Sequence, residues 1–206
     1  MNLYHHPFSA NARKTVMTAL LLDVDVELVL VDLRAGDNQK AEYLALNPMG
    51  KVPTLVDGER VLWESHAIMQ YLADQAPADA LYPTDRFARA DVNRWLFWSA
   101  AHWSTNIALL VQQHVINRMR GQGEPDPSLV ALGEREVVRF GKVLDDHLAE
   151  RNYLCGTTLT LADLAVAAPL MYTVPGKIPV TDFANIQKWF GWIQDLEVWR
   201  KTIPAS

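Results

Sequence analysis

Cysteine is almost absent from this chain, whose 206 residues include only Cys155. One thiol can form no disulfide within the chain and no cysteine-rich metal site. The shortage fits a reducing compartment, so we expect a cytoplasmic protein without a metal. The chain must be held together by an ordinary hydrophobic core, for which its 50% content of hydrophobic residues is sufficient.

An excess of basic residues is also lacking. The formal net charge is −5, whereas a nucleic-acid-binding domain usually presents a basic face. Long apolar runs are missing as well, since the run at residues 19–22 is far shorter than the ~20 residues of a membrane span. The first residues resemble no secretory signal. We therefore expect neither nucleic acid nor a membrane as a partner.

Strand and helix patterns alternate over residues 1–77. A short strand at 2–4 precedes a helix at 10–22, whose apolar residues recur at helical spacing. Residues 26–31 form an apolar run with almost no polar face, which predicts a strand covered on both sides. A helix at 37–46, a hairpin around Asp57-Gly58 and a helix containing residues 67–72 follow. The predicted order is β-α-β-α-β-β-α.

The rest of the chain has a different character. Residues 85–119 contain no Pro or Gly and are rich in Trp, Ala and Leu, so one long helix is expected. A second helix is predicted at 128–150, and one or two short helices at 189–199. Thr160 and Asp163 have the spacing of a capping box, and we interpret them as fold determinants. Cys155, in the loop before this box, is expected to be structural.

Two segments suit the binding of an extended anionic peptide. The first segment is Asn47-Pro-Met-Gly-Lys-Val-Pro53, a short turn followed by a Val-Pro pair and then by a strand. The backbone of Val52 can form hydrogen bonds with an extended peptide as a neighbouring strand would. About ten residues later, Glu64-Ser65 opens a helix, whose N-terminus can hold a carboxylate. Pro53 could equally begin an edge strand, and Glu64 and Ser65 could be ordinary first-turn residues.

In this order and spacing the motifs resemble those of the cytosolic glutathione S-transferase family, in its bacterial, serine-type, theta/phi/nu-like branches. The marks are Pro7-Phe-Ser9, the 47–53 segment, Glu64-Ser65 and Thr160-x-x-Asp163, and they cover essentially the whole chain. The resemblance implies a thioredoxin-like α/β domain at 1–77, a linker at 78–84 and an all-helical domain at 85–206. It further implies glutathione as cosubstrate and, through the long Trp-rich helix, a homodimer.

The same resemblance assigns the chemistry to the turn before the first helix. Ser9 inherits the role of donating its hydroxyl to the glutathione thiolate, although Ser is also a common N-cap. Asn11 completes a Ser-x-Asn-x-x-Lys pattern in which the Asn assists the sulfur, or it is a solvated helix residue. Thioredoxin-like redox proteins carry Cys-x-x-Cys at this turn. Its absence here excludes a two-cysteine exchange mechanism.

The resemblance also distributes glutathione over its binding residues. It implies a cis Pro53 and places the Val52 backbone against the cysteinyl unit. Ser65 takes the γ-glutamyl carboxylate and Glu64 the α-ammonium.

The remaining contacts are less defined. Gln39 and Lys51 are candidates for the glycyl carboxylate, but the chain departs from many relatives at both positions. His5 and His6 are adjacent near the first strand, so at most one of them is expected to face the cleft. The pocket for a small hydrophobic electrophile is expected between the loop around Phe8 and the middle of the long helix. Its candidate residues are Phe8, His102, Trp103 and Asn106.

The predicted function is conjugation of the glutathione thiolate to apolar electrophiles. The same thiolate could instead drive disulfide reduction, dehalogenation or isomerisation. A third alternative is a non-catalytic binding protein on the same fold. Such proteins often lose the hydroxyl of the first helix or the Glu-Ser pair, and both are present here.

Overall fold

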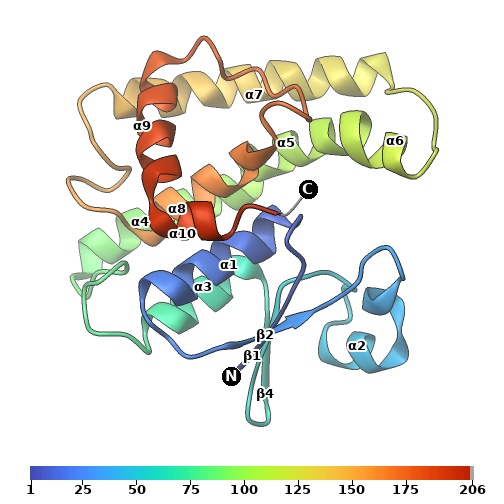
Figure 1. Ribbon diagram of the computed structural model, residues 1–206. Helices are drawn as coiled ribbons and strands as arrows, with labels where there is room; N and C mark the ends of the chain where they lie inside the picture. The colour runs from blue at the N-terminus through green and yellow to red at the C-terminus, as the bar shows by residue number, and fades with distance from the viewer. Residues whose placement is uncertain (205–206) are drawn as a thin grey trace. The chain divides into compact units, whose positions relative to one another are not determined.

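The computed structural model describes residues 1–204 and divides into two compact units (Figure 1). The first unit contains Met1–Asp85 and the residues from Leu196 onward, and the second contains Arg86–Asp195. The predicted helical domain at 85–206 therefore includes a C-terminal segment that packs with the N-terminal unit. Its short helix, α10 (Glu197–Lys201), contacts the first helix of the chain.

A four-stranded sheet forms the centre of the N-terminal unit (Figure 1). Its strand order is β2-β1-β3-β4, with β2 parallel to β1 and with β3 antiparallel to both β1 and β4. Asp57 pairs with Arg60 across the predicted hairpin, and Gly58 supplies the positive φ of the turn. The strands are β1 (Asn2–His5), β2 (Glu27–Leu30), β3 (Thr54–Asp57) and β4 (Arg60–Trp63).

Helices α1 (Ala10–Leu21) and α3 (Ser65–Ala73) pack against each other and bury the main core of this unit. The core side chains include Leu3, Val16, Leu55, Ile68 and Leu72, which are at most 6% exposed. The helix expected at 37–46 is interrupted, because Lys40 adopts an extended conformation between η1 (Asp37–Gln39) and α2 (Ala41–Leu46). The β-α-β-α-β-β-α order itself is confirmed.

The prediction of a strand covered on both sides at 26–31 is wrong. β2 lies at the edge of the sheet, and its Leu28 and Leu30 are 44% and 61% exposed. An apolar run records which residues can be buried, but strand order decides whether a neighbour covers them. Here β1 is the only strand that pairs with β2 within residues 1–204.

The second unit is helical throughout its regular structure, as predicted. One continuous helical path runs from Arg86 to Met119 and includes two turns of π-helix. After a loop, Asp126 caps the next helix by accepting from the backbone N–H groups of Ser128 and Leu129. The segments of the path are α4 (Arg86–Trp98), η2 (Ser99–Trp103), α5 (Ser104–Val111), η3 (Gln112–Ile116) and α6 (Asn117–Met119). The later helices of the unit are α7 (Pro127–Leu148), α8 (Leu161–Ala167), η4 (Ala168–Tyr172) and α9 (Ala184–Asp195).

Asp163 organises the interior of the helical unit, in agreement with its interpretation as a fold determinant. It is fully buried, and burial raises the pKa of its carboxyl. Its Oδ2 accepts from the N–H and the hydroxyl of Thr160, and its Oδ1 accepts from Leu154 N–H and Trp189 Nε1. No helix within residues 1–204 is long and apolar enough to cross a membrane.

Candidate active site

Ser9 is the N-cap of α1. Its Oγ accepts from the backbone N–H of Ala12 at 3.2 Å, and its own N–H donates to His6 O at 2.9 Å. The side chain is therefore held in one orientation by the helix start. A hydroxyl has one donor as well as acceptor capacity, so capping leaves the O–H proton free to donate. The capping and thiolate-binding interpretations of Ser9 are compatible.

Asn11 occupies the second position of α1 and is exposed. Its side-chain amide has no hydrogen-bond partner among the residues that the structure describes. A neighbouring group could therefore receive its N–H donors without competition from the protein.

The loop before β3 is built around Asn47 and Tyr43, which are both buried. Asn47 Nδ2 and the Tyr43 hydroxyl each donate to Lys51 O at 2.7 Å, and both also reach Thr54 Oγ1. Asn47 and Tyr43 thus both fix the loop at the carbonyl of Lys51 and at Thr54. A loop fixed by side chains can present its backbone to a ligand without reordering.

The Val52–Pro53 peptide bond is cis, as the resemblance implies. Val52 is 8% exposed and packs with Ala12. Neither its N–H nor its C=O has a hydrogen-bond partner within residues 1–204. Buried backbone groups are nearly always paired, so the open donor and acceptor of Val52 mark this position as one that an extended ligand would complete.

The start of α3 is likewise open. Glu64 is its N-cap residue with a φ of 74°, which non-glycine residues seldom adopt, and it supplies no side-chain cap. Ser65 follows at 6% exposure, and its hydroxyl has no partner in the described part of the chain. Uncapped N–H groups and the helix dipole favour an anion at such a helix start.

Contacts of α1 bring these segments together. Ala12, three residues after Ser9, belongs to the same cluster as Val52. Lys14, in the next turn, has its Nζ 2.8 Å from Nε2 of His66, which is the residue after Ser65. The Ser9 turn, the cis-proline loop and the α3 start therefore lie around the first two turns of α1.

The Lys14–His66 contact was not predicted from the sequence. Lys14 is 1% exposed, and burial lowers the pKa of its amine to about 7, although the carboxylate of Glu64 raises it. Burial, together with the positive charge of Lys14, lowers the pKa of His66 to about 2. The available sequence signal was the place of Lys14 in the Ser-x-Asn-x-x-Lys pattern, and the structure shows that every residue of α1 from Ala12 to Ala19 is buried.

Gln39 is the last residue of η1 and Lys51 lies in the loop before β3, and both are exposed. Gln39 Nε2 approaches Gly50 O at 3.5 Å, which is a weak contact. Lys51 makes no ion pair within the described residues, whereas the nearby Lys40 is paired with Asp37 at 2.6 Å. Of these cations, Lys51 is the one left without a carboxylate.

The four candidate pocket residues have different environments. Phe8 is 49% exposed, and His102 is exposed with its ring 4.9 Å from that of Phe140. Asn106 donates to His102 O at 2.7 Å. Trp103 is fully buried and donates to Val166 O, so its assignment as a pocket residue is wrong. A helix packed against others exposes one face, and Trp103 lies on the buried face.

Cys155 is unsuited to nucleophilic chemistry. Burial, first, and the nearby carboxylate of Asp91 raise the pKa of its thiol to about 12. The thiolate is the reactive form of cysteine. Cys155 is therefore protonated at neutral pH, which agrees with its interpretation as a structural residue.

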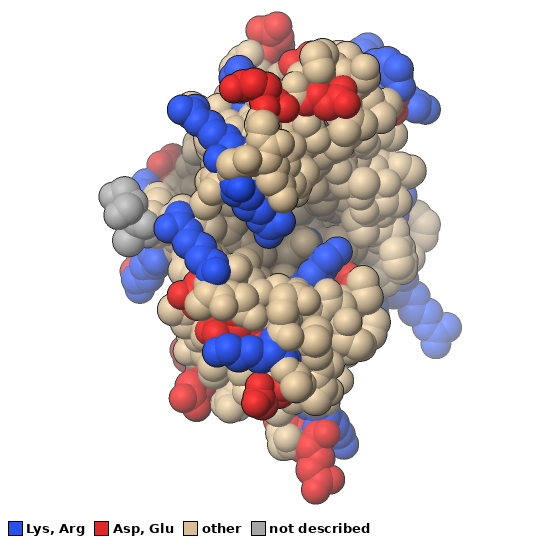
Figure 2. Space-filling model, turned by 90° about the vertical axis from the view of Figure 1, so that its right-hand side faces the viewer, with Lys and Arg blue, Asp and Glu red and all other residues tan. Residues whose placement is uncertain are grey.

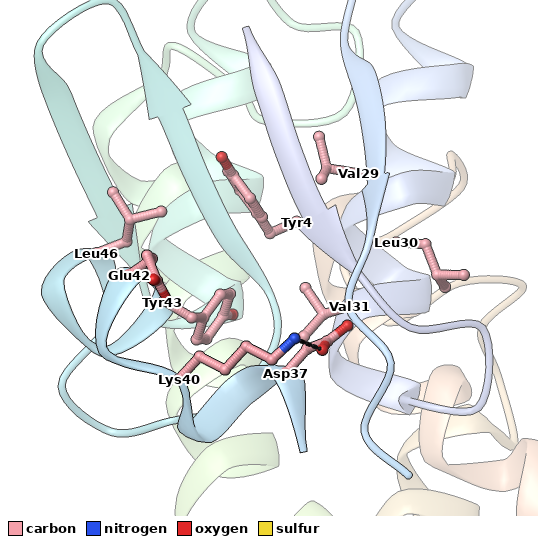
Figure 3. Close-up of a pocket in the computed structure, with 9 residues that line it drawn as sticks. All are labelled: Tyr4, Val29, Leu30, Val31, Asp37, Lys40, Glu42, Tyr43 and Leu46. Atoms are coloured by element: carbon pink, nitrogen blue, oxygen red, sulfur yellow. Dashed lines mark ion pairs between the residues drawn. The ribbon is translucent and has the colours of Figure 1, made fainter. Parts of the chain in front are cut away.

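A cavity of about 200 Å³ lies on the sheet near α2 (Figure 3). Tyr4, Val29 and Val31 form part of its wall, and the Lys40–Asp37 ion pair lies at one end. None of the predicted site residues lines it. Its cation is already neutralised, and we assign no catalytic role to this cavity.

Charge and metal-ligand distributions add two observations. Figure 2 shows one face of the molecule, on which Lys and Arg side chains are interspersed with Asp and Glu. That face therefore carries no continuous basic surface. Residues 1–204 contain no group of three His, Cys, Asp or Glu side chains placed to hold a metal ion.

Comparison with known proteins identifies the two units. A family model described as "Glutathione S-transferase, N-terminal domain" matches residues 1–74, and one described as "Glutathione S-transferase, C-terminal domain" matches residues 104–195. The chain is also 32% identical to "Glutathione S-transferase 3" of Zea mays over 211 residues, which cover 100% of this chain and 94% of that protein.

Solved structures agree with this similarity. Glutathione transferase F2 from Populus trichocarpa superposes with a TM-score of 0.89 at 26% identity, covering 98% of this chain and 96% of the other. A delta-class glutathione transferase of Nilaparvata lugens gives a TM-score of 0.84 at 31% identity, with 98% and 92% covered. The likeness therefore extends over both units.

Proposed function

The chain belongs to the glutathione S-transferase family, and we propose from this premise that it joins the glutathione thiolate to apolar electrophiles. The observation that carries the proposal is the set of unpaired groups around the start of α1. These are the backbone of Val52, the hydroxyl of Ser65 and the O–H proton of Ser9. A γ-glutamyl peptide has complementary groups for all three.

Glutathione binding follows from the chemistry of these groups. The cysteinyl unit pairs with the N–H and C=O of Val52 as an added strand would. The γ-glutamyl carboxylate accepts from Ser65 and the open N-terminus of α3, and Glu64 pairs with the α-ammonium. Lys51, which has no carboxylate partner in the described part of the chain, and Gln39 face the glycyl end. This orientation brings the sulfur to the Ser9 turn.

Thiolate formation is the role of Ser9. A free thiol with a pKa of ~8.5 is mostly protonated at pH 7. To lower that pKa by about two units, the site must stabilise the thiolate over the thiol by roughly 2.7 kcal/mol. A hydrogen bond from the Ser9 hydroxyl and the dipole of α1 both favour the charged sulfur. The thiol proton passes to solvent. The thiolate then forms a bond to the electrophilic carbon, and any leaving group departs with its electron pair.

Calorimetry and affinity capture test the cosubstrate. We expect saturable binding of reduced glutathione and retention on immobilised glutathione. Aryl halide conjugation, followed by absorbance, then tests the reaction. A protein that is not retained and releases no heat with glutathione would disprove the proposed function.

Disulfide reduction is a second candidate, because Asn11, two residues after Ser9, is exposed and its amide has no partner within residues 1–204. In such a reaction the glutathione thiolate would attack one sulfur of a disulfide and form a mixed disulfide, while the other sulfur would leave as a thiolate and take a proton from solvent. A second glutathione would reduce the mixed disulfide and form glutathione disulfide, and Asn11 would stabilise the attacking sulfur. Turnover of hydroxyethyl disulfide compared with an aryl halide separates the two activities. If Asn11→Ala affected the first reaction and not the second, disulfide reduction would be favoured.

A homodimer is part of the proposal. The family resemblance implies the dimer, and Phe97 on α4, which is 73% exposed, is the surface residue chosen to test it. Light scattering is expected to give twice the 23.2 kDa mass of the chain. Phe97→Glu is expected to weaken the association, and a wild-type monomer at micromolar concentration would contradict it.

A further inference from the structure

A second cavity, of about 190 Å³, lies in the N-terminal unit away from the proposed glutathione site. It lies between the end of β1, α1, β2 and the residues after α10, which run beside the start of α1 (Figure 1). Neither Ser9, Val52, Glu64 nor Ser65 lines it. The basic side chains of its wall are His5, His6, Arg13 and Lys201.

Arg13 is the central observation. It is only 4% exposed, yet its partners are all neutral: Nε donates to Thr202 Oγ1 at 3.0 Å and Nη2 to Trp199 O at 2.7 Å. Its guanidinium also stacks over the Trp199 ring at 3.8 Å. Burial lowers its pKa to about 10, so it is a cation at pH 7.

Arg13 therefore has no ionic partner among the described residues. Nη1 has no partner, and no carboxylate pairs with the guanidinium, within residues 1–204. A buried cation without a carboxylate is costly, and an anion in the cavity would offset that cost.

The other titratable groups at the cavity add no unpaired positive charge at pH 7, so Arg13 is its main cation. Lys201 is already paired with Glu197 at 2.7 Å. Burial and the neighbouring His6 lower the pKa of His5. The pKa of His6 is lowered by burial and by Arg34, although Asp32 raises it. The histidines are thus neutral at pH 7 while the cavity is empty, and each can gain a proton when an anion enters.

Much of the remaining wall is apolar, so a ligand that fills the cavity should have an apolar body. These apolar residues are Pro7, Val16, Leu28, Ile203 and Pro204. We propose that this cavity binds a small carboxylate with an apolar body, whose charged group lies against Arg13 and the two histidines. The site is independent of glutathione and of the proposed conjugation.

The arrangement links binding to protons. An anion beside His5 and His6 favours their charged forms, so complex formation takes up protons and affinity increases as the pH falls. Adjacent strand residues face opposite ways. Both histidines can line one cavity because β1 ends at His5.

Benzoate is a suitable probe, and benzamide, which has the same shape without the charge, is its control. We expect the NMR signals of the His5 and His6 rings to shift saturably with benzoate in the glutathione-free protein. The affinity should be at least about threefold higher at pH 5.5 than at pH 8, because histidine titrates between these values. Benzamide should cause no comparable shift at either pH.

Two variants localise the site. Leu28→Phe places a larger side chain in the cavity at a half-exposed edge position, and the double variant His5→Gln with His6→Gln removes the proton uptake. The first should lose benzoate binding while it retains glutathione binding, and the second should lose the pH dependence. Lys142→Gln, on an exposed part of α7, is the control. Benzoate binding that is absent at pH 5.5, matched by benzamide, or unchanged in Leu28→Phe would overturn the proposal.

Discussion

The amine of Lys14 lies 2.8 Å from Nε2 of His66, and this contact joins α1 to the first turn of α3. Lys14 is fully buried, and burial lowers the pKa of its amine, although the carboxylate of Glu64 is the charge that raises it. Burial together with the charge of Lys14 lowers the pKa of His66. The pair thus places a titratable amine in contact with the residue that follows Ser65.

The Lys14–His66 pair predicts that stability increases with pH. The pKa of Lys14 is lowered from 10.5 to about 7 in the folded protein. Between these values the unfolded chain binds more protons, so the free energy of unfolding rises with pH, by at most about 1.4 kcal/mol per pH unit for one group. Urea unfolding between pH 7 and 8.5 measures this slope.

Lys14→Met is the variant that isolates the effect. Its unfolding free energy should depend less steeply on pH over the same range, whereas Lys142→Met, at an exposed position, should keep the wild-type slope. If the free energy of unfolding had the same pH slope in wild type and Lys14→Met, the pKa of Lys14 would not be lowered in the folded protein.

Capping and thiolate binding by Ser9 can be separated. Ser9→Ala removes both, so it should lower the free energy of unfolding by about 0.5–2 kcal/mol and reduce the ultraviolet absorbance of bound thiolate at pH 7. Ser9→Asp keeps a capping oxygen but has no O–H donor and adds a negative charge beside the sulfur. It should fold like the wild type and still lose the thiolate. If Ser9→Asp retained full thiolate absorbance, Ser9 would act as a cap alone.

Ser65 should affect binding more than turnover. Ser65→Ala removes one hydrogen bond to a charged carboxylate, which is worth about 1.5–3 kcal/mol, and we expect the KM for glutathione to rise roughly tenfold or more with little change in kcat. The matched control is Ser128→Ala, in the first turn of α7, which Asp126 already caps. A fall in kcat with an unchanged KM would contradict the role of Ser65 in binding.

Asp163 should be the most sensitive carboxylate for folding. Asp163→Ala leaves the N–H groups of Leu154, Thr160 and Trp189 buried without an acceptor. At about 1–3 kcal/mol for each group, a loss of at least 3 kcal/mol in the free energy of unfolding is expected in urea titrations. Asp146→Ala removes only an exposed ion pair with Lys142 and should cost less than about 1 kcal/mol. Comparable losses in the two variants would refute the assignment.

Local signals predicted much of this structure. Asp57-Gly58 specifies a hairpin through two neighbouring residues, and the helices at 10–22 and 128–150 follow from spacing within a few turns. Ser9 caps a helix through the N–H of Ala12, three residues away. Such features depend on near neighbours in the chain, so sequence patterns report them well.

Features that depend on distant partners were not predicted. The run at 26–31 carried no sign that β2 would lie at an edge, and Trp103 gave no sign that its ring would face Val166 rather than a pocket. Lys14 entered the sequence analysis only as the last residue of the Ser-x-Asn-x-x-Lys pattern, and its partner His66 lies 52 residues away in the chain. In each case the deciding neighbour comes from another element.

The sequence by itself thus determined the order of the elements, the family and the segments that suit glutathione, because caps, turns and helix starts are local chemistry. Only the tertiary structure decided that, among residues 1–204, the backbone of Val52 has no hydrogen-bond partner and the guanidinium of Arg13 has no carboxylate partner. It also set the acidity of Lys14. The physical reason is that desolvation and pairing depend on the atoms that surround a group in space, and residues far apart in the chain supply those atoms.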